Sequence, residues 1–201
     1  MACEFYKVMY RLMNITNQQK AERFISVLRH CQLLGLKVLQ ADKTSLQMRL
    51  PYSDDIIGNP MMGIIHGGAL TTLMDTACGT ACFVAIEGME LCPTLDLRVD
   101  YMKASEPGLD LVAHASVSRI TNNVIFTECQ VRQEIDNTLV AKCNATFMRI
   151  GAEMTPPKFR TVIENGDASP FMGTEPLVKT IKKDAGQKST NKTATKTEGE
   201  S

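Results

Sequence analysis

The sequence predicts an α+β fold in which one curved antiparallel sheet wraps a single buried helix. Three observations lead to this prediction. Segment 68–86 is apolar around almost its whole circumference, which is typical of a helix enclosed by other structure. Three or four long segments after it alternate apolar and polar residues and are separated by tight polar turns. Helix and strand patterns are segregated along the chain, as in α+β proteins.

The first elements are expected to be a helix and two short strands. Thr16 or Asn17 can cap a helix over roughly 17–31. Within that segment, apolar residues recur at helical spacings of three and four, at Phe24, Val27, Leu28 and Cys31. Segments 38–40 and 45–50 have strand composition and are joined by a polar turn, so we expect them to form a hairpin.

The remaining elements are a loop over 52–63, the buried helix, and the strands of the main sheet. Segment 94–105 places Leu95, Leu97 and Val99 on one face and charged residues on the other. Three further segments have strand patterns: 109–120, 124–133 and 138–150. Because the turns between these strands are short and polar, we expect antiparallel pairing between neighbours in the chain.

The chain of 201 residues is long enough for one domain with extensions. We expect an N-terminal extension over 1–15, the domain over 16–151 and a C-terminal extension over 152–201. Residues 177–201 contain six lysines and no aromatic residue, so they are predicted to be a disordered tail. The first 14 residues lack the pattern of a signal peptide, and we therefore expect a cytoplasmic protein.

Composition argues against several classes of function. The formal net charge is zero and Trp is absent, so neither a nucleic-acid partner nor a base-stacking surface is expected. His66 and Asp75 interrupt the apolar run over 64–86, which argues against a membrane span. The seven cysteines form no CxxC pair, so we expect buried free thiols, no metal site and no cofactor.

Asp75 is the single charged residue of the buried helix. A buried carboxylate costs several kcal/mol of desolvation unless a partner compensates it. No Lys or Arg lies three or four residues away on the same helix. Asp75 is therefore either hydrogen-bonded for a structural reason or faces a cavity where its charge is used.

The residues before this helix favour the second reading. His66, Gly67 and Gly68 stand at its N-terminus, where free amides can polarise a carbonyl oxygen. Gly67 and Asp75 are eight residues apart, roughly 12 Å along a helix axis. One small carbonyl group cannot contact both on the same chain. If both act on one substrate, the sites lie across the interface of a two-fold dimer.

The motif N-P-x-x-G-x-x-H-G-G (residues 59–68), an acid nine residues after the histidine, and the following "TLDLRVDYMKA" resemble the hotdog-fold acyl-CoA thioesterases of the phenylacetic-acid (PaaI-like) type. The resemblance covers about residues 20–150. It implies a hotdog fold, with a long central helix wrapped by a curved antiparallel sheet, assembled as a homodimer and often as a homotetramer. It also implies an enzyme of fatty acid metabolism that needs no metal.

The resemblance also implies roles for individual residues. Asp75 matches the acid that either activates a hydrolytic water or attacks directly, and the Gly67 amide matches the oxyanion donor, with Gly68 beside it in the substrate-binding loop. His66 and Asn59 match residues that orient the thioester and assist the leaving thiol. Thr94 matches a Ser or Thr that holds the water. Each has a structural alternative: His66 as a loop cap, Asn59 as a turn residue before Pro60, and Thr94 as an ordinary strand residue.

The leading hypothesis is hydrolysis of medium-chain, long-chain or aryl-acyl CoA to the free acid and CoA. Two alternatives remain open: a non-catalytic acyl-CoA-binding hotdog protein, and a hotdog hydratase or dehydratase. Hotdog dehydratases have a different sequence pattern, in which the histidine is further from the acid and a Pro-Gly motif lies between them. This chain lacks that pattern. The binder would be expected to lack Asp75 or the His-Gly-Gly motif, and this chain has both.

Overall fold

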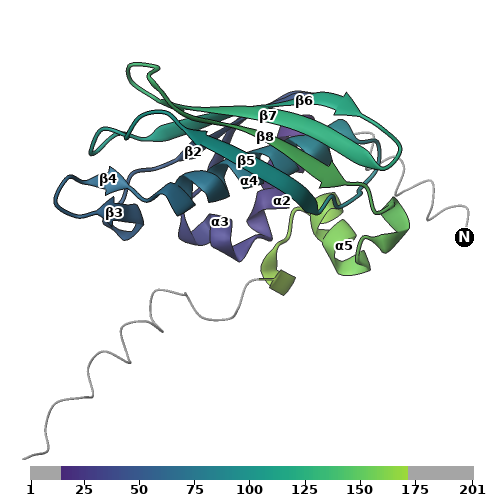
Figure 1. Ribbon diagram of the computed structural model, residues 1–201. Coiled ribbons are helices and arrows are strands. Elements are labelled where there is room, and N and C mark those ends of the chain that lie inside the picture. Colours follow the sequence, from purple (N-terminus) through teal and green to yellow (C-terminus); the bar gives the residue numbers. More distant parts are fainter. Residues whose placement is uncertain (1–14, 172–201) are drawn as a thin grey trace, which may run out of the picture.

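The computed structural model describes residues 15–171, in which a long helix packs on one face of a six-stranded antiparallel sheet (Figure 1). Residues 1–14 and the predicted lysine-rich tail lie outside the described residues. The sheet contains, in spatial order, β1 (Lys37–Ala41), β2 (Ser45–Leu50), β6 (Leu111–Ile120), β7 (Val124–Gln133), β8 (Leu139–Met148) and β5 (Thr94–Tyr101). The predicted α+β architecture, a buried helix wrapped by a curved antiparallel sheet, is confirmed.

The central helix is α4 (Gly67–Ala85), which packs against β2, β6, β7 and β8. Its hydrophobic residues form the middle of the main core because the sheet covers one side of the helix and α2 packs on another. Its fully buried residues include Leu73, Met74, Ala77, Cys78 and Cys82. The predicted alternation of the strands is visible in β6, where Ala113 and Ala115 are buried and His114 between them is exposed.

The predicted helix over 17–31 is wrong in its continuity. The structure has two helices instead, α2 (Asn17–Ser26) and α3 (Arg29–Leu33), with extended backbone at Leu28. Val27 packs against the small cluster around Phe83, whereas Leu28 packs against the main core. The break between the helices directs these two neighbours to different clusters. Thr16 is the cap, and with Gln19 it forms a capping box.

The segment expected to be a loop over 52–63 contains short regular elements. A 3-10 turn, η1 (Asp54–Ile56), leads into β3 (Ile57–Asn59), which pairs with β4 (Ile64–Ile65). The His66 amide donates to the Ile56 carbonyl oxygen at 2.8 Å and extends this pairing to the start of α4. The small sheet therefore fixes the chain that enters the central helix.

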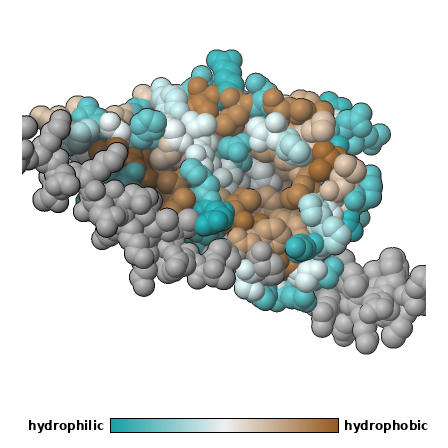
Figure 2. All heavy atoms as spheres, turned by 90° about the horizontal axis from the view of Figure 1, so that it is seen from below, coloured by the Kyte–Doolittle hydropathy of each residue, from teal (hydrophilic) through white to brown (hydrophobic). Residues whose placement is uncertain are grey.

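After β8 the chain passes through η2 (Ala152–Met154) into α5 (Pro157–Asn165) and η3 (Ser169–Phe171). Helix α5 closes a second apolar cluster, in which the ring of Phe83 lies 4.7 Å from that of Phe24 and 5.7 Å from that of Phe159. Arg23 donates to two carbonyl oxygens at the end of α5, where a cation is favoured. Figure 2 shows hydrophobic residues in several patches on the face seen from below, with hydrophilic residues between and around them.

Helix α4 is the one described helix that is long and apolar enough to cross a membrane. However, 72% of the window that meets this criterion is buried inside the protein. The core helix of a globular protein passes the same test, so this is weak evidence for a span.

Candidate active site

Asp75 is half-buried in the middle of α4 and is held by a residue of the neighbouring strand. The Thr94 hydroxyl, at the first position of β5, donates to Asp75 Oδ1 at 2.8 Å. Within residues 15–171, Oδ2 has no hydrogen-bond partner and no cation pairs with the carboxylate. The predicted pair of Asp75 and Thr94 therefore lies together, with one carboxylate oxygen held and the other open.

The N-terminus of α4 is capped by the histidine that precedes it. His66 Nδ1 accepts a hydrogen bond from the Gly68 amide at 2.9 Å. In the neutral ring the proton is therefore on Nε2, which is left to donate elsewhere. The Gly68 amide is taken by this cap, whereas the Gly67 amide is the first of the helix and has no intrahelical acceptor. Of the two glycines predicted to act, Gly67 is therefore the one whose amide is not engaged by the histidine cap.

Asn59 has a turn function in the structure. Its side-chain Oδ1 accepts from the Met61 amide at 3.1 Å, and the residue is exposed at the end of β3. This is the arrangement expected for Asn before Pro in a tight turn. Asn59 pairs with Ile64 across the small sheet, so it shapes the loop from which His66 emerges.

Gly58 was not singled out by sequence reasoning, although the position of His66 depends on it. A Cβ added at Gly58 would lie 2.8 Å from His66 Cα, closer than real Cβ atoms approach backbone. Gly58→Ala is therefore expected to push β3 away from His66 and to destabilise the protein by about 1–3 kcal/mol, as overpacking does. Thermal unfolding should show a Tm lowered by roughly 2–12 °C. An unchanged Tm would mean that the chain around Gly58 accommodates the added methyl group without loss of stability.

Two hydroxyls that the sequence reasoning missed lie at the same helix end. The Tyr101 hydroxyl, from the last residue of β5, donates to the Gly67 carbonyl oxygen at 2.9 Å, and Thr71 Oγ1 donates to the same oxygen at 3.1 Å. Gly67 and Tyr101 also line a cavity of about 350 Å³, together with Ile64, Leu70, Met102, Lys103 and Val140. This cavity gives the end of α4 a place for a ligand group.

The structure thus forms two groups of predicted residues rather than one. His66, Gly67 and Gly68 lie at the N-terminus of α4, with Asn59 in the adjoining loop. Asp75 and Thr94 lie two turns further along the helix. Eight residues separate Gly67 from Asp75, roughly 12 Å of helix. Within one chain, the open amide and the open carboxylate oxygen do not converge on one small carbonyl group.

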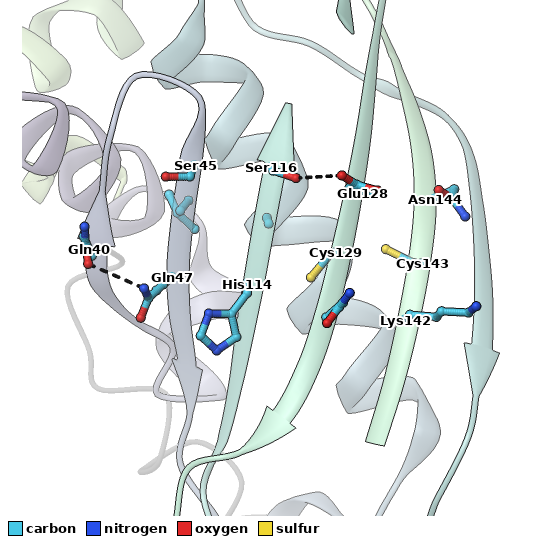
Figure 3. Close-up of a pocket in the computed structure, with 13 residues that line it drawn as sticks. Gln40, Ser45, Gln47, His114, Ser116, Glu128, Cys129, Lys142, Cys143 and Asn144 are labelled. Atoms are coloured by element: carbon cyan, nitrogen blue, oxygen red, sulfur yellow. Dashed lines mark hydrogen bonds between the residues drawn. The ribbon is translucent and has the colours of Figure 1, made fainter. Parts of the chain in front are cut away.

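A second cavity, of about 550 Å³, lies on the face of the sheet opposite α4 (Figure 3). Its labelled side chains include His114, Glu128 and Lys142, and none of the predicted site residues lines it. His114 is exposed on the polar side of β6, and partial burial together with the charge of Arg132 lowers its pKa. The predicted active-site groups are therefore on the helix side of the sheet.

The structure gathers three thiols that the sequence spacing did not bring together. The Sγ atoms of Cys78, Cys129 and Cys143, from α4, β7 and β8, lie within 4.8 Å of one another. Hydrogen bonds with Cys143 and Cys78, together with burial, raise the pKa of the Cys129 thiol. No fourth His, Cys, Asp or Glu of the described chain joins them, one ligand short of a closed zinc site. We interpret the cluster as thiols packed in the core.

The fold defined by these elements, a long helix wrapped by a curved antiparallel sheet, is that of a hotdog protein. The family model described as "Thioesterase superfamily" matches residues 62–140, which include the whole of α4 and β5. A solved structure of a Pseudomonas aeruginosa protein is 49% identical, with a TM-score of 0.62, and covers 67% of this chain and 100% of that chain. The chain belongs to the thioesterase superfamily, as the resemblance implied.

Two curated relatives extend this comparison. The medium/long-chain acyl-CoA thioesterase YigI of Salmonella typhimurium is 26% identical over 140 residues, which are 63% of this chain and 89% of that protein. A Halobacterium salinarum protein is 35% identical over 101 residues, 49% of this chain. The chain spans about two thirds of that relative, 66% of its length.

Proposed function

We propose that this protein hydrolyses acyl-CoA thioesters, with medium-chain, long-chain or aryl-acyl groups, to the free acid and CoA. The observation that carries the proposal is the half-buried Asp75, with one oxygen held by Thr94 and the other open on an otherwise apolar helix. Membership of the thioesterase superfamily and the name of the YigI relative support the same reaction. At 26% identity the relative supports the class of substrate rather than a chain length.

The chemistry needs a base, a water and an oxyanion donor. Asp75 takes a proton from the water, whose oxygen bonds to the thioester carbon. The Gly67 amide stabilises the negative charge that develops on the carbonyl oxygen. The C–S bond then breaks, the acid is released, and the CoA sulfur takes up the proton. Thr94 donates its hydroxyl hydrogen to Asp75, so its oxygen lone pairs can accept a hydrogen from the same water.

This mechanism requires Gly67 from one protomer and Asp75 from the other, and we propose a homodimer for that reason. Within the described chain β8 is the only strand that pairs with β5, so the other edge of β5 is left without a partner strand. Along it and just after it, Leu95, Tyr101 and Met102 are each more than half exposed. Exposed apolar side chains on an unpaired edge are typical of a surface that a second copy covers.

The direct test is thiol release from a panel of acyl-CoAs of increasing chain length and one aryl-acyl CoA, followed with a chromogenic thiol reagent. A blank of protein alone corrects for the cysteines of the chain. Turnover on any member supports the proposal, and the panel then ranks the substrates. Saturable binding of acyl-CoA without thiol release on any member would instead identify a non-catalytic binder and overturn the hydrolase.

A further inference from the structure

Three oxygen atoms form a closed triangle at the N-terminus of α4. The Tyr101 hydroxyl lies 2.9 Å from the Gly67 carbonyl oxygen and 2.7 Å from Thr71 Oγ1, and Thr71 Oγ1 lies 3.1 Å from the same carbonyl oxygen. Tyr101 comes from the end of β5 and Thr71 from the first turns of α4. The triangle therefore joins the edge strand to the start of the central helix.

The Gly67 carbonyl oxygen has two possible hydroxyl donors and needs only one of them. Two hydroxyl hydrogens are shared among three close pairs, because the carbonyl oxygen has none to give. Both hydroxyls can donate to Gly67, or one can donate to the other hydroxyl while that hydroxyl donates to Gly67. In every arrangement the Gly67 carbonyl oxygen keeps at least one hydroxyl donor. Removing either hydroxyl alone leaves the other in place.

The triangle holds one side of a peptide unit whose other side is held by the histidine. The peptide between Gly67 and Gly68 has its carbonyl bonded to the hydroxyls and its amide bonded to His66 Nδ1. The Tyr101 ring also closes over Gly67, since a Cβ added there would lie 3.3 Å from ring atoms. The Gly67 Cα is thus fixed from two directions, and with it the direction of the Gly67 amide.

A threonine bonded to the carbonyl four residues earlier is common in helices and is by itself no evidence of function. Thr72 does the same to Gly68 in this helix, at 3.0 Å, and Thr80 to Thr76, at 2.7 Å. What distinguishes Thr71 is the second hydroxyl, supplied by another element, and the place of the shared carbonyl beside the open amide.

We infer that Tyr101, with Thr71 as its redundant partner, is a positioning residue that aims the Gly67 amide at the developing oxyanion. The inference rests on the proposed thioester hydrolysis. Tyr101 does not donate to the substrate, because its hydroxyl is hydrogen-bonded to the Gly67 carbonyl oxygen. Its effect is transmitted through the peptide unit to the amide next to it.

The inference is tested with Tyr101→Phe, Thr71→Val and the double variant, all of which keep the side-chain shapes. Each single variant should lower kcat for thiol release less than threefold. The double variant should lower kcat at least tenfold further than the product of the singles predicts, with KM within about threefold of the unchanged protein. Tyr101→Phe combined with Thr72→Val is the matched control, and it should match Tyr101→Phe alone.

Strictly multiplicative effects, or a change confined to KM, would overturn the inference. So would a double variant whose Tm falls so far that unfolding accounts for the lost activity. Hydrogen exchange at the Gly68 amide, which is bonded to His66 Nδ1, separates the two proposals. Exchange should be at least tenfold faster in the double variant than in either single variant, even if the protein releases no thiol. Unchanged exchange refutes the positioning, whereas fast exchange without any thiol release in the wild type refutes only the hydrolase.

Discussion

Replacing Asp75 with asparagine is expected to lower kcat for thioester hydrolysis by a hundredfold or more. Positioned general bases contribute about 10²–10⁴-fold, and an amide cannot take a proton from water at neutral pH. Asparagine keeps the size of the side chain, and its carbonyl oxygen can still accept the Thr94 hydroxyl at the place of Oδ1. The loss should therefore appear in kcat, measured by thiol release on the best substrate of the panel.

Asp96→Asn is the matched control for this prediction. Asp96 is an exposed carboxylate on the same strand as Thr94, and within residues 15–171 no hydrogen bond or ion pair joins its side chain to a predicted site residue. Its replacement should leave kcat within about twofold, as most surface changes leave a protein nearly unaltered. If Asp75→Asn retains the wild-type kcat, Asp75 is not the base, and its bond to Thr94 is structural.

Much of the fold follows from periodicity in the sequence. Strands β7 and β8 alternate between buried and exposed residues because one face packs on α4 and the other is polar, and the short turn between them specifies their pairing. Local patterns do not reveal the break near Leu28, because it depends on which of two clusters each neighbour joins. The short β3–β4 pair was missed for a similar reason, since its residues have no alternation of their own.

In the candidate site, too, some residues could be predicted from the local sequence and others could not. Asp75 and the His66–Gly68 turn could be found because they stand out locally, as a charge in an apolar helix and as two glycines at a helix start. Tyr101 could not, because 34 residues separate it from Gly67 and only the sheet brings them together. The thiols of Cys78, Cys129 and Cys143 likewise meet only through the packing of α4 on β7 and β8. Contacts between distant segments are what the sequence pattern cannot supply.

The largest expected effect on stability comes from the ion pair between Glu90 and Arg149. Glu90 is almost fully buried in the connection that leads to β5, and Arg149 directly follows β8. Arg149 Nη2 lies 2.8 Å from Glu90 Oε2, and the Gly151 amide donates to Oε1 at 2.9 Å. Arg149 also donates to the Thr121 carbonyl oxygen. The pair therefore ties the approach to Thr94 to the end of the sheet.

Arg149→Met should destabilise the protein by about 3–5 kcal/mol at pH 7, because it leaves a buried carboxylate without its cation. Urea unfolding measures this change. The double variant with Glu90→Gln should recover most of the loss, since no buried charge then remains. Equal stability of the single and double variants would mean that lost packing of the arginine, and not the unpaired charge, is responsible.

The pH dependence of the destabilisation distinguishes an unpaired buried charge from a loss of packing. Burial acts to raise the pKa of Glu90, but the hydrogen bonds from Arg149 and the Gly151 amide outweigh it and hold that pKa below its ordinary value of 4.5. In the wild type the stabilisation is thus present above about pH 4.5 and is lost as the pH falls through the lowered pKa. Without Arg149, burial dominates and raises the pKa of Glu90. As the pH falls, protonation of Glu90 therefore removes the buried charge that destabilises the variant. The difference in unfolding free energy between the two proteins should therefore be largest near pH 7 and shrink towards pH 4, whereas a pure packing loss would stay constant.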